Sequence, residues 1–89
     1  MPVLSMFYGI LVRMYFFDDR QHHQPHCHAE YAGERAVFSL ENGEVLAGGL
    51  PVAQTRLVQA WVEIHRDELL ANWQLALRGD ELFRIEPLR

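Results

Sequence analysis

Three polar side chains able to do chemistry stand at alternate positions of one short segment: His26, His28 and Glu30. On a β-strand, residues two apart point to the same face, with Cβ atoms about 7 Å apart. Two imidazoles and a carboxylate placed in this way can bind a divalent metal such as zinc or iron, and this set favours ferrous iron. The same spacing also occurs on strands whose exposed face is simply polar. The segment therefore predicts either a metal site or a polar surface.

Four more residues are candidates for the same surface. Ser39 and Glu41 share the face of the three residues above in the register argued below, and Ser39 lies beside His28 there. That pairing would suit a general base, and Arg13 with Tyr15 on the preceding strand would suit an anion. Because the sequence supplies no Gly-rich phosphate cradle, we interpret these four first as surface-interaction residues.

The first half of the chain predicts a four-stranded antiparallel meander. Residues 1–5 are interpreted as a lead-in, and residues 9–17 are branched and aromatic, as in a mostly buried strand. A polar loop follows over 18–25, then strands over 26–32 and 35–40 and a fourth near 44–48. The turns expected between the last three are Gly33-Glu34 and Asn42-Gly43, of which the second is a strong hairpin signal.

The two expected turns define a register, and that register sorts the side chains by face. It places Cys27 opposite Leu40, Ala29 opposite Phe38 and Phe38 opposite Ala47, all on one apolar face. Cys27 is then a small core residue. As the only cysteine, it has no disulfide partner within the chain.

The second half of the chain predicts helix. Residues 52–64 carry apolar side chains at helical spacing, including Trp61, and a second apolar arc over 67–78 is rotated from the first. We expect a break near 65–67 with Asp67 as the second N-cap and Gly79 as the terminating glycine, although one kinked helix is an alternative. Residues 82–86 are a possible short C-terminal edge strand. The fold class is α+β, with two C-terminal helices packed on one face of the sheet.

Length, charge and composition argue against several classes of function. With 89 residues, 49% of them hydrophobic, the chain is expected to be one domain spanning 1–89. The formal net charge is −4, which disfavours nucleic-acid binding by phosphate neutralisation. No apolar stretch approaches the ~20 residues of a membrane span, and no secretion signal is recognised, so we expect a cytoplasmic protein.

Several segments taken in order resemble a known bacterial family. They are residues 7–10, 14–16, 25–31, 41–45, 50–51 and 65–73. The chain resembles the family called domain of unknown function 4160, whose members typically show Pro-Pro-His-Phe-His-Ala in the third block. Here Gln24 and Cys27 replace the first proline and the phenylalanine, while His26 and His28 are kept. The resemblance implies a small prokaryotic accessory protein, often encoded beside a domain of unknown function 2442 in an arrangement similar to toxin–antitoxin modules.

Two functional hypotheses follow. The first is an interaction module of such a two-gene unit, binding a protein partner or a second copy of the chain through the polar sheet face. The alternative is a metal-dependent enzyme or RNA-acting toxin that uses His26, His28 and Glu30.

Overall fold

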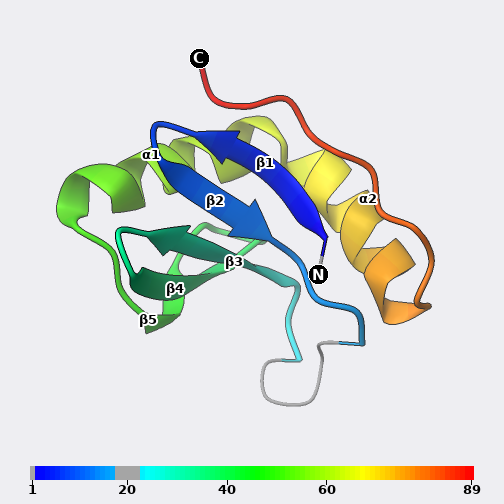
Figure 1. Ribbon diagram of the computed structural model, residues 1–89. Helices are drawn as coiled ribbons and strands as arrows, with labels where there is room; N and C mark the ends of the chain where they lie inside the picture. Colours follow the sequence, from blue (N-terminus) through cyan, green and yellow to red (C-terminus); the bar gives the residue numbers. More distant parts are fainter. Residues whose placement is uncertain (1, 18–22) are drawn as a thin grey trace.

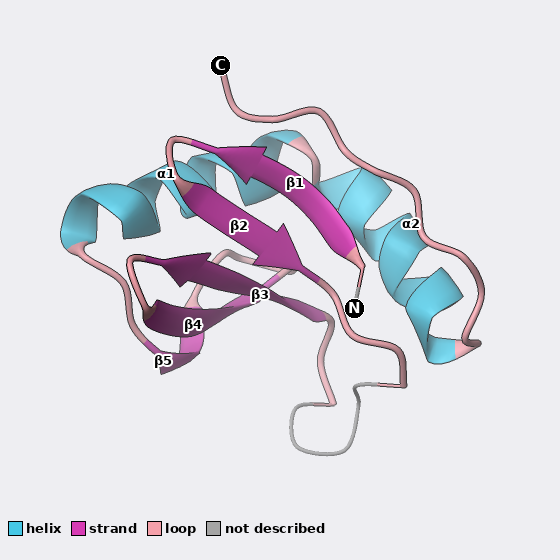
Figure 2. Cartoon of the chain, in the orientation of Figure 1, coloured by secondary structure: helices cyan, strands magenta, loops and turns pink. Residues whose placement is uncertain are grey.

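Five strands are followed by two helices in the computed structural model, which describes residues 2–17 and 23–89. The elements are β1 (Val3–Phe7), β2 (Ile10–Arg13), β3 (His26–Tyr31), β4 (Glu34–Ser39), β5 (Val45–Gly48), α1 (Val52–Ile64) and α2 (Arg66–Leu77). The strands form one antiparallel sheet in the order β1-β2-β3-β4-β5, with each strand beside its neighbour in sequence (Figures 1 and 2). The α+β class and the meander are confirmed.

The ends of the chain differ from the expectation. The segment interpreted as a lead-in overlaps β1, which pairs with β2 and makes the sheet five-stranded rather than four-stranded. The possible C-terminal edge strand is absent, because residues 80–89 form neither helix nor strand. We call residues 80–89 the strap, since Figure 1 shows this segment running back along α2 and past β1.

The β3–β4 turn consists of Ala32 and Gly33 rather than Gly33 and Glu34. Both residues have positive φ, 50° and 84°, as a two-residue hairpin turn of the primed type requires. Tyr31 therefore pairs with Glu34, and Cys27 pairs with Phe38 instead of Leu40. The predicted register was wrong by two residues. Because side chains alternate with a period of two, the faces were nevertheless assigned correctly along most of this hairpin.

The β4–β5 register also differs from the prediction. Phe38 pairs with Val45 and Val37 with Ala47, with an irregularity between the two pairs. The expected pairing of Phe38 with Ala47 is therefore wrong. Gly43, with φ of 78°, keeps the turn role predicted for it, but its N–H donates to the Ser39 carbonyl, which widens the turn beyond two residues.

One face of the sheet forms the core with the helices. Val12, Ala29 and Phe38 from the strands are completely buried, as are Trp61 and Leu69 from the helices. The Phe7 and Trp61 rings lie 5.3 Å apart, which joins β1 to α1. Both helices thus cover the same face, as the sequence predicted, and the opposite face carries no helix from residues 2–17 or 23–89 (Figure 1).

The helical half is two helices that meet at His65. This residue, with φ −109° and ψ 23°, caps the end of α1 and the start of α2, so the expected break is confirmed while the N-cap is His65 rather than Asp67. Gly79, with φ of 74°, follows the C-cap Arg78 as predicted. None of the described helices is sufficiently long and apolar to cross a bilayer.

Candidate functional site

The face opposite the helices is assembled from cross-strand rows of side chains. One row runs Met6–Leu11–Glu30–Arg35 and the next runs Arg13–His28–Val37–Ala47. We call these eight residues the open face. Met6 and Arg35 are exposed and the other six are partly buried, so the face combines apolar strips with charged groups.

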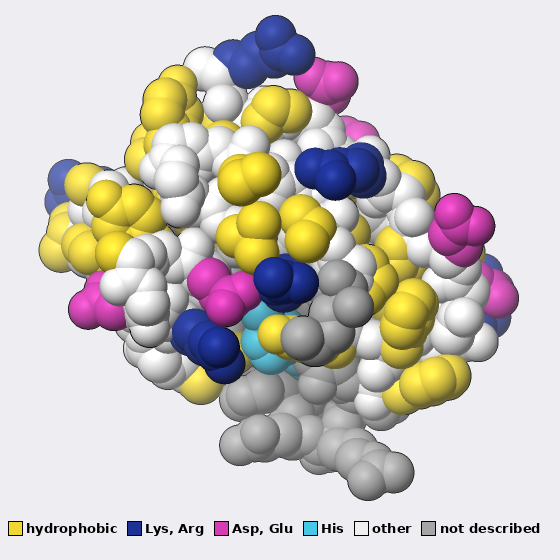
Figure 3. Space-filling model, in the orientation of Figure 1, with side chains coloured by type: hydrophobic (Ala, Val, Ile, Leu, Met, Phe, Trp, Pro, Cys, Tyr) yellow, Lys and Arg dark blue, Asp and Glu magenta, His cyan; other side chains and the backbone are white. Residues whose placement is uncertain are grey.

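A charged trio lies at the centre of the open face. The Arg13 Nε donates to the Glu30 Oε2 at 2.8 Å, and the Arg35 Nε lies 3.3 Å from the other oxygen. The side chains of Arg13 and Glu30 are 25% and 27% exposed, so this pair is partly shielded from solvent. Figure 3 shows an acidic side chain between two basic ones on this face, beside histidine and below a group of hydrophobic side chains.

Four aromatic rings form a contact series from the open face toward the helices. Tyr15 meets His28 edge-on at 4.4 Å, His28 lies 5.2 Å from His26, and His26 lies 4.9 Å from Trp73 of α2. The His26 Nδ1 is also 3.0 Å from the Gln24 carbonyl oxygen. His28 is thus a partly exposed residue backed by a buried one.

His26 corrects the sequence expectation. It was placed on an open polar surface beside His28, but its side chain is only 1% exposed. Alternation along the strand is preserved, since His26 pairs with Ser39 and shares its parity with His28. The burial arises because His26 is the first residue of β3, at the end of the sheet where Trp73 of α2 closes over the strand. Alternation along a strand therefore does not predict which side chains are buried at this end of the sheet.

Ser39 is a second correction. It is completely buried, so it cannot contribute to an interaction surface, and it lies opposite His26 rather than His28. Its hydroxyl donates to the Gln24 Oε1 at 3.4 Å and accepts from the Glu41 N–H at 3.1 Å, which fixes the turn after β4. Glu41 itself is exposed beyond the end of that strand. Arg13 belongs to the open face and Tyr15 contacts His28 beside it, while Ser39 is not placed to act with His28 as a general base.

The structure does not bring the proposed metal ligands together. Among residues 2–17 and 23–89, no group of three His, Cys, Asp or Glu side chains is placed to hold a metal ion. The Glu30 carboxylate faces two guanidinium groups instead of the imidazoles. Zinc or iron binding by His26, His28 and Glu30 stays a prediction.

Cys27 belongs to the core, as its parity predicted. It is completely buried on the helix-covered face, and this burial raises the pKa of its thiol from 9.0 to about 12. The thiol is therefore protonated at neutral pH and is a poor nucleophile or metal ligand.

A shallow hollow of about 270 Å³ opens beside His28, between β4 and β5. Arg35, Val37 and Ala47 of the open face line it, together with Ala36 and Gly48. Its floor is largely apolar, which suits a side chain from another molecule better than a free ion.

Sequence reasoning missed the side-chain hydrogen bonds of Asn72 and Trp61 that position the strap. Asn72, completely buried in α2, donates to the Phe83 carbonyl at 2.8 Å and accepts from the Phe83 N–H at 3.1 Å. Trp61 Nε1 donates to the Glu86 carbonyl at 2.8 Å. The sequence signal for a buried hydrogen bond was Asn72, a polar residue among the apolar residues of a helix that packs on the core.

A family model now places the chain among known sequences. The model for a domain of unknown function, DUF4160, matches residues 9–74, which run from the start of β2 almost to the end of α2. The chain belongs to the DUF4160 family. No curated protein and no solved structure matches it. The DUF4160 match includes all of the open face except Met6, while β1 and the strap lie outside it.

Proposed function

We propose that this DUF4160 protein is a protein-interaction module whose binding surface is the open face. The observation that carries the proposal is the one-sided packing of the sheet. Both helices cover one face, and no element of this chain within residues 2–17 and 23–89 packs as a layer on the other. A sheet with one uncovered face and a hollow beside it offers a docking surface to a second protein.

The chemistry of the open face favours a protein over a nucleic acid or a free ion. Leu11, Val37 and Ala47 provide apolar area, while the Arg13–Glu30–Arg35 trio provides charges of both signs. Interfaces combine an apolar centre with polar groups that select the partner. The net charge of −4 opposes binding to a polyanion.

The partner we propose is a different protein, the product of the neighbouring gene in a toxin–antitoxin-like two-gene unit. The net charge supports a different protein over a second copy. Each copy carries a net charge of −4, so two copies would repel each other. The two-gene arrangement itself comes from the family resemblance.

Native mass spectrometry and titration calorimetry with the neighbouring gene product test this proposal. Val37→Asp and Arg35→Glu on the open face should each weaken the complex at least tenfold, a loss of about 1.4 kcal/mol or more. Matched changes on the outer side of α1, Val52→Asp and Arg56→Glu, should leave the affinity unchanged because both residues are exposed there. Thermal melts of all four variants check folding.

Two results would contradict the proposal. One is a folded, monomeric wild-type chain that binds no neighbour at micromolar concentration. The other is equal loss of affinity in the open-face and α1 variants, which would move the interface elsewhere. If the wild-type chain forms a homodimer that Val37→Asp dissociates, the open face is still the binding surface, but the partner is a second copy of the chain.

A further inference from the structure

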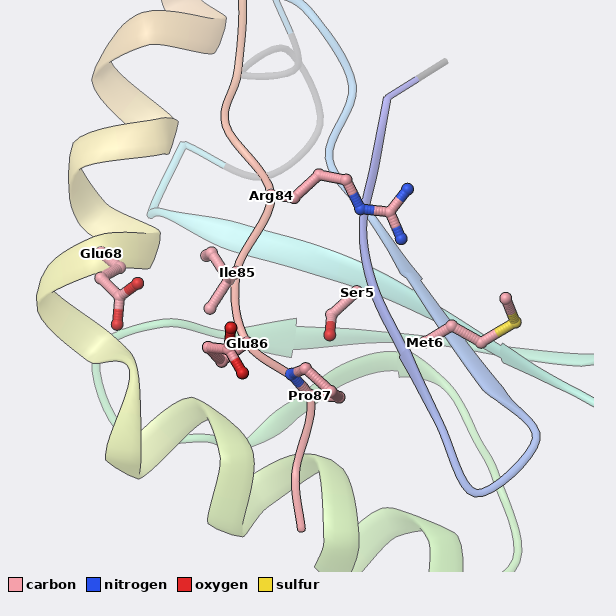
Figure 4. Close-up of a pocket in the computed structure, with 7 residues that line it drawn as sticks. All are labelled: Ser5, Met6, Glu68, Arg84, Ile85, Glu86 and Pro87. Atoms are coloured by element: carbon pink, nitrogen blue, oxygen red, sulfur yellow. The ribbon is translucent and has the colours of Figure 1, made fainter.

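The strap and β1 line a second hollow, and its lining residues differ from those of the hollow beside His28. The strap is fixed there by hydrogen bonds from two directions: Asn72 of α2 holds Phe83, and the Ile85 N–H donates to the Leu4 carbonyl of β1 at 2.8 Å. Between the strap and β1 lies a space of about 310 Å³, which we call the strap hollow (Figure 4). It is large enough for one side chain or a small organic molecule.

Ser5 of β1 forms the inner wall of the strap hollow and lacks a hydrogen bond. The residue is 2% exposed, and its hydroxyl is the one buried side-chain polar atom in the described parts of the chain without a partner. Figure 4 shows this hydroxyl between β1 and the strap, pointing toward Glu86 and Pro87. A buried unpaired hydroxyl costs stability, so a ligand that bonds to it recovers what folding leaves unsatisfied.

Two carboxylates line the same hollow. Glu68 comes from the first turn of α2 and Glu86 from the strap. Glu68 uses its Oε1 to contact His65 Nδ1 at 2.7 Å, and Glu86 uses its Oε2 to contact Arg89 at 2.8 Å. The second oxygen of each carboxylate has no partner among the described residues. These oxygens and the Ser5 hydroxyl together offer three hydrogen-bond acceptors.

The described lining carries two carboxylates, of which Glu86 also pairs with Arg89, and one basic residue, so it favours a cation over an anion. Arg84 is the only basic residue in the lining, and in Figure 4 its guanidinium extends past β1, away from Glu68. The two carboxylates would repel an anion, and a neutral ligand would leave their acceptors poorly matched. Ile85 and Pro87 add apolar surface to the same walls, suited to a hydrocarbon chain.

We propose that the strap hollow binds an alkylguanidinium or alkylammonium group, with the cationic head on Ser5, Glu68 and Glu86 and the aliphatic stem on Ile85 and Pro87. The head supplies the hydrogen-bond donors that the three acceptors require. A basic side chain of another protein and a free aliphatic amine both present this chemistry. The proposal is independent of the open-face interface, since it uses a different set of residues.

An NMR titration of the full chain with n-butylguanidinium tests it. Saturable shifts are expected at the methyl groups of Ile85. Ser5→Ala and Glu86→Gln should each weaken binding at least threefold, and Glu34→Gln, an exposed glutamate of β4, should not change it. An N-acetyl, N′-methylamide derivative of arginine distinguishes the sources. Equal or tighter binding indicates a protein side chain, and clearly weaker binding indicates a free amine.

The melting temperature of Ser5→Ala separates ligand binding from a structural role. If the hydroxyl serves a ligand, its removal eliminates an unsatisfied group, so the variant should melt at or above the wild-type temperature while binding more weakly. Three results would overturn the proposal: no saturable shift up to about 50 mM, equal shifts with butyrate, or equal weakening by Glu34→Gln.

Discussion

The two faces of one sheet have different partners, although both are made by the same strands. On the helix-covered face, Val12, Ala29 and Phe38 are completely buried against α1 and α2. On the open face, Leu11, His28 and Val37 are only partly buried, and Glu30 is held between two arginines. The first face stabilises the fold, and the second retains side chains that the fold does not need to bury. These partly exposed side chains are the reason that we propose the open face as the binding surface.

The largest expected contrast is between Trp61 and Met6. Trp61→Ala removes a completely buried ring from the core and its hydrogen bond to the strap, and should lower the free energy of unfolding by about 3 to 5 kcal/mol. Met6→Ala, on a 59% exposed side chain of the open face, should cost under about 0.5 kcal/mol. Urea denaturation measures both. A comparable loss in the two variants would mean that the open face is also core.

A sharper comparison uses the same substitution on both faces. Val12→Ala should cost about 2 kcal/mol because this side chain is completely buried, and Val37→Ala about 1 kcal/mol or less because its side chain is partly exposed. Circular dichroism in urea gives both values with the chemistry held constant. If Val37→Ala proves the more costly, the assignment of faces is at fault.

Cys27 should give the helix-covered face a distinctive response to pH. Burial raises the pKa of its thiol from 9.0 to about 12, so the folded chain keeps this proton where the unfolded chain loses it. Stability should therefore fall as the pH rises from about 9 to about 12, by up to ~1.4 kcal/mol per pH unit.

The difference between wild type and Cys27→Ala, followed by urea titration at each pH, isolates this contribution from that of other groups. The slope of the wild type should exceed that of the variant. Parallel slopes would show that the thiol is accessible to solvent.

A small effect is expected from the charged trio of the open face. Glu30→Gln removes the charge that pairs with Arg13 and Arg35 and should cost about 0.5 to 1 kcal/mol, less in 1 M salt. Glu63→Gln, which breaks an exposed pair with Arg66 on the helices, provides the matched control. A cost above about 3 kcal/mol for Glu30→Gln would make the trio a structural device of the fold.

The same contrast explains what the sequence could predict. Alternation along β3 assigned Cys27 and Ala29 to the core, and the assignment survived a two-residue error in the turn because faces repeat every second residue. The helical break at His65 followed from the rotation of two apolar arcs. These patterns depend on local periodicity, which one sequence contains.

Features that depend on contacts between distant segments were missed. His26 has the parity of an open-face residue but is buried by Trp73, which lies in α2. Residues 82–86 alternate in part like a strand. They form no strand ladder, and side-chain hydrogen bonds join Asn72 to Phe83 and Trp61 to Glu86 instead. No local pattern reports such pairings.

The most direct test of the account is an NMR footprint of the neighbouring gene product on the isotope-labelled chain. We predict that methyl signals of Leu11, Val37 and Ala47 on the open face shift or broaden, while those of Val52 and Ile64, exposed on α1, stay in place. A footprint confined to Val52 and Ile64, with the open-face methyl groups unchanged, would contradict the central claim that the uncovered side of the sheet is the binding surface.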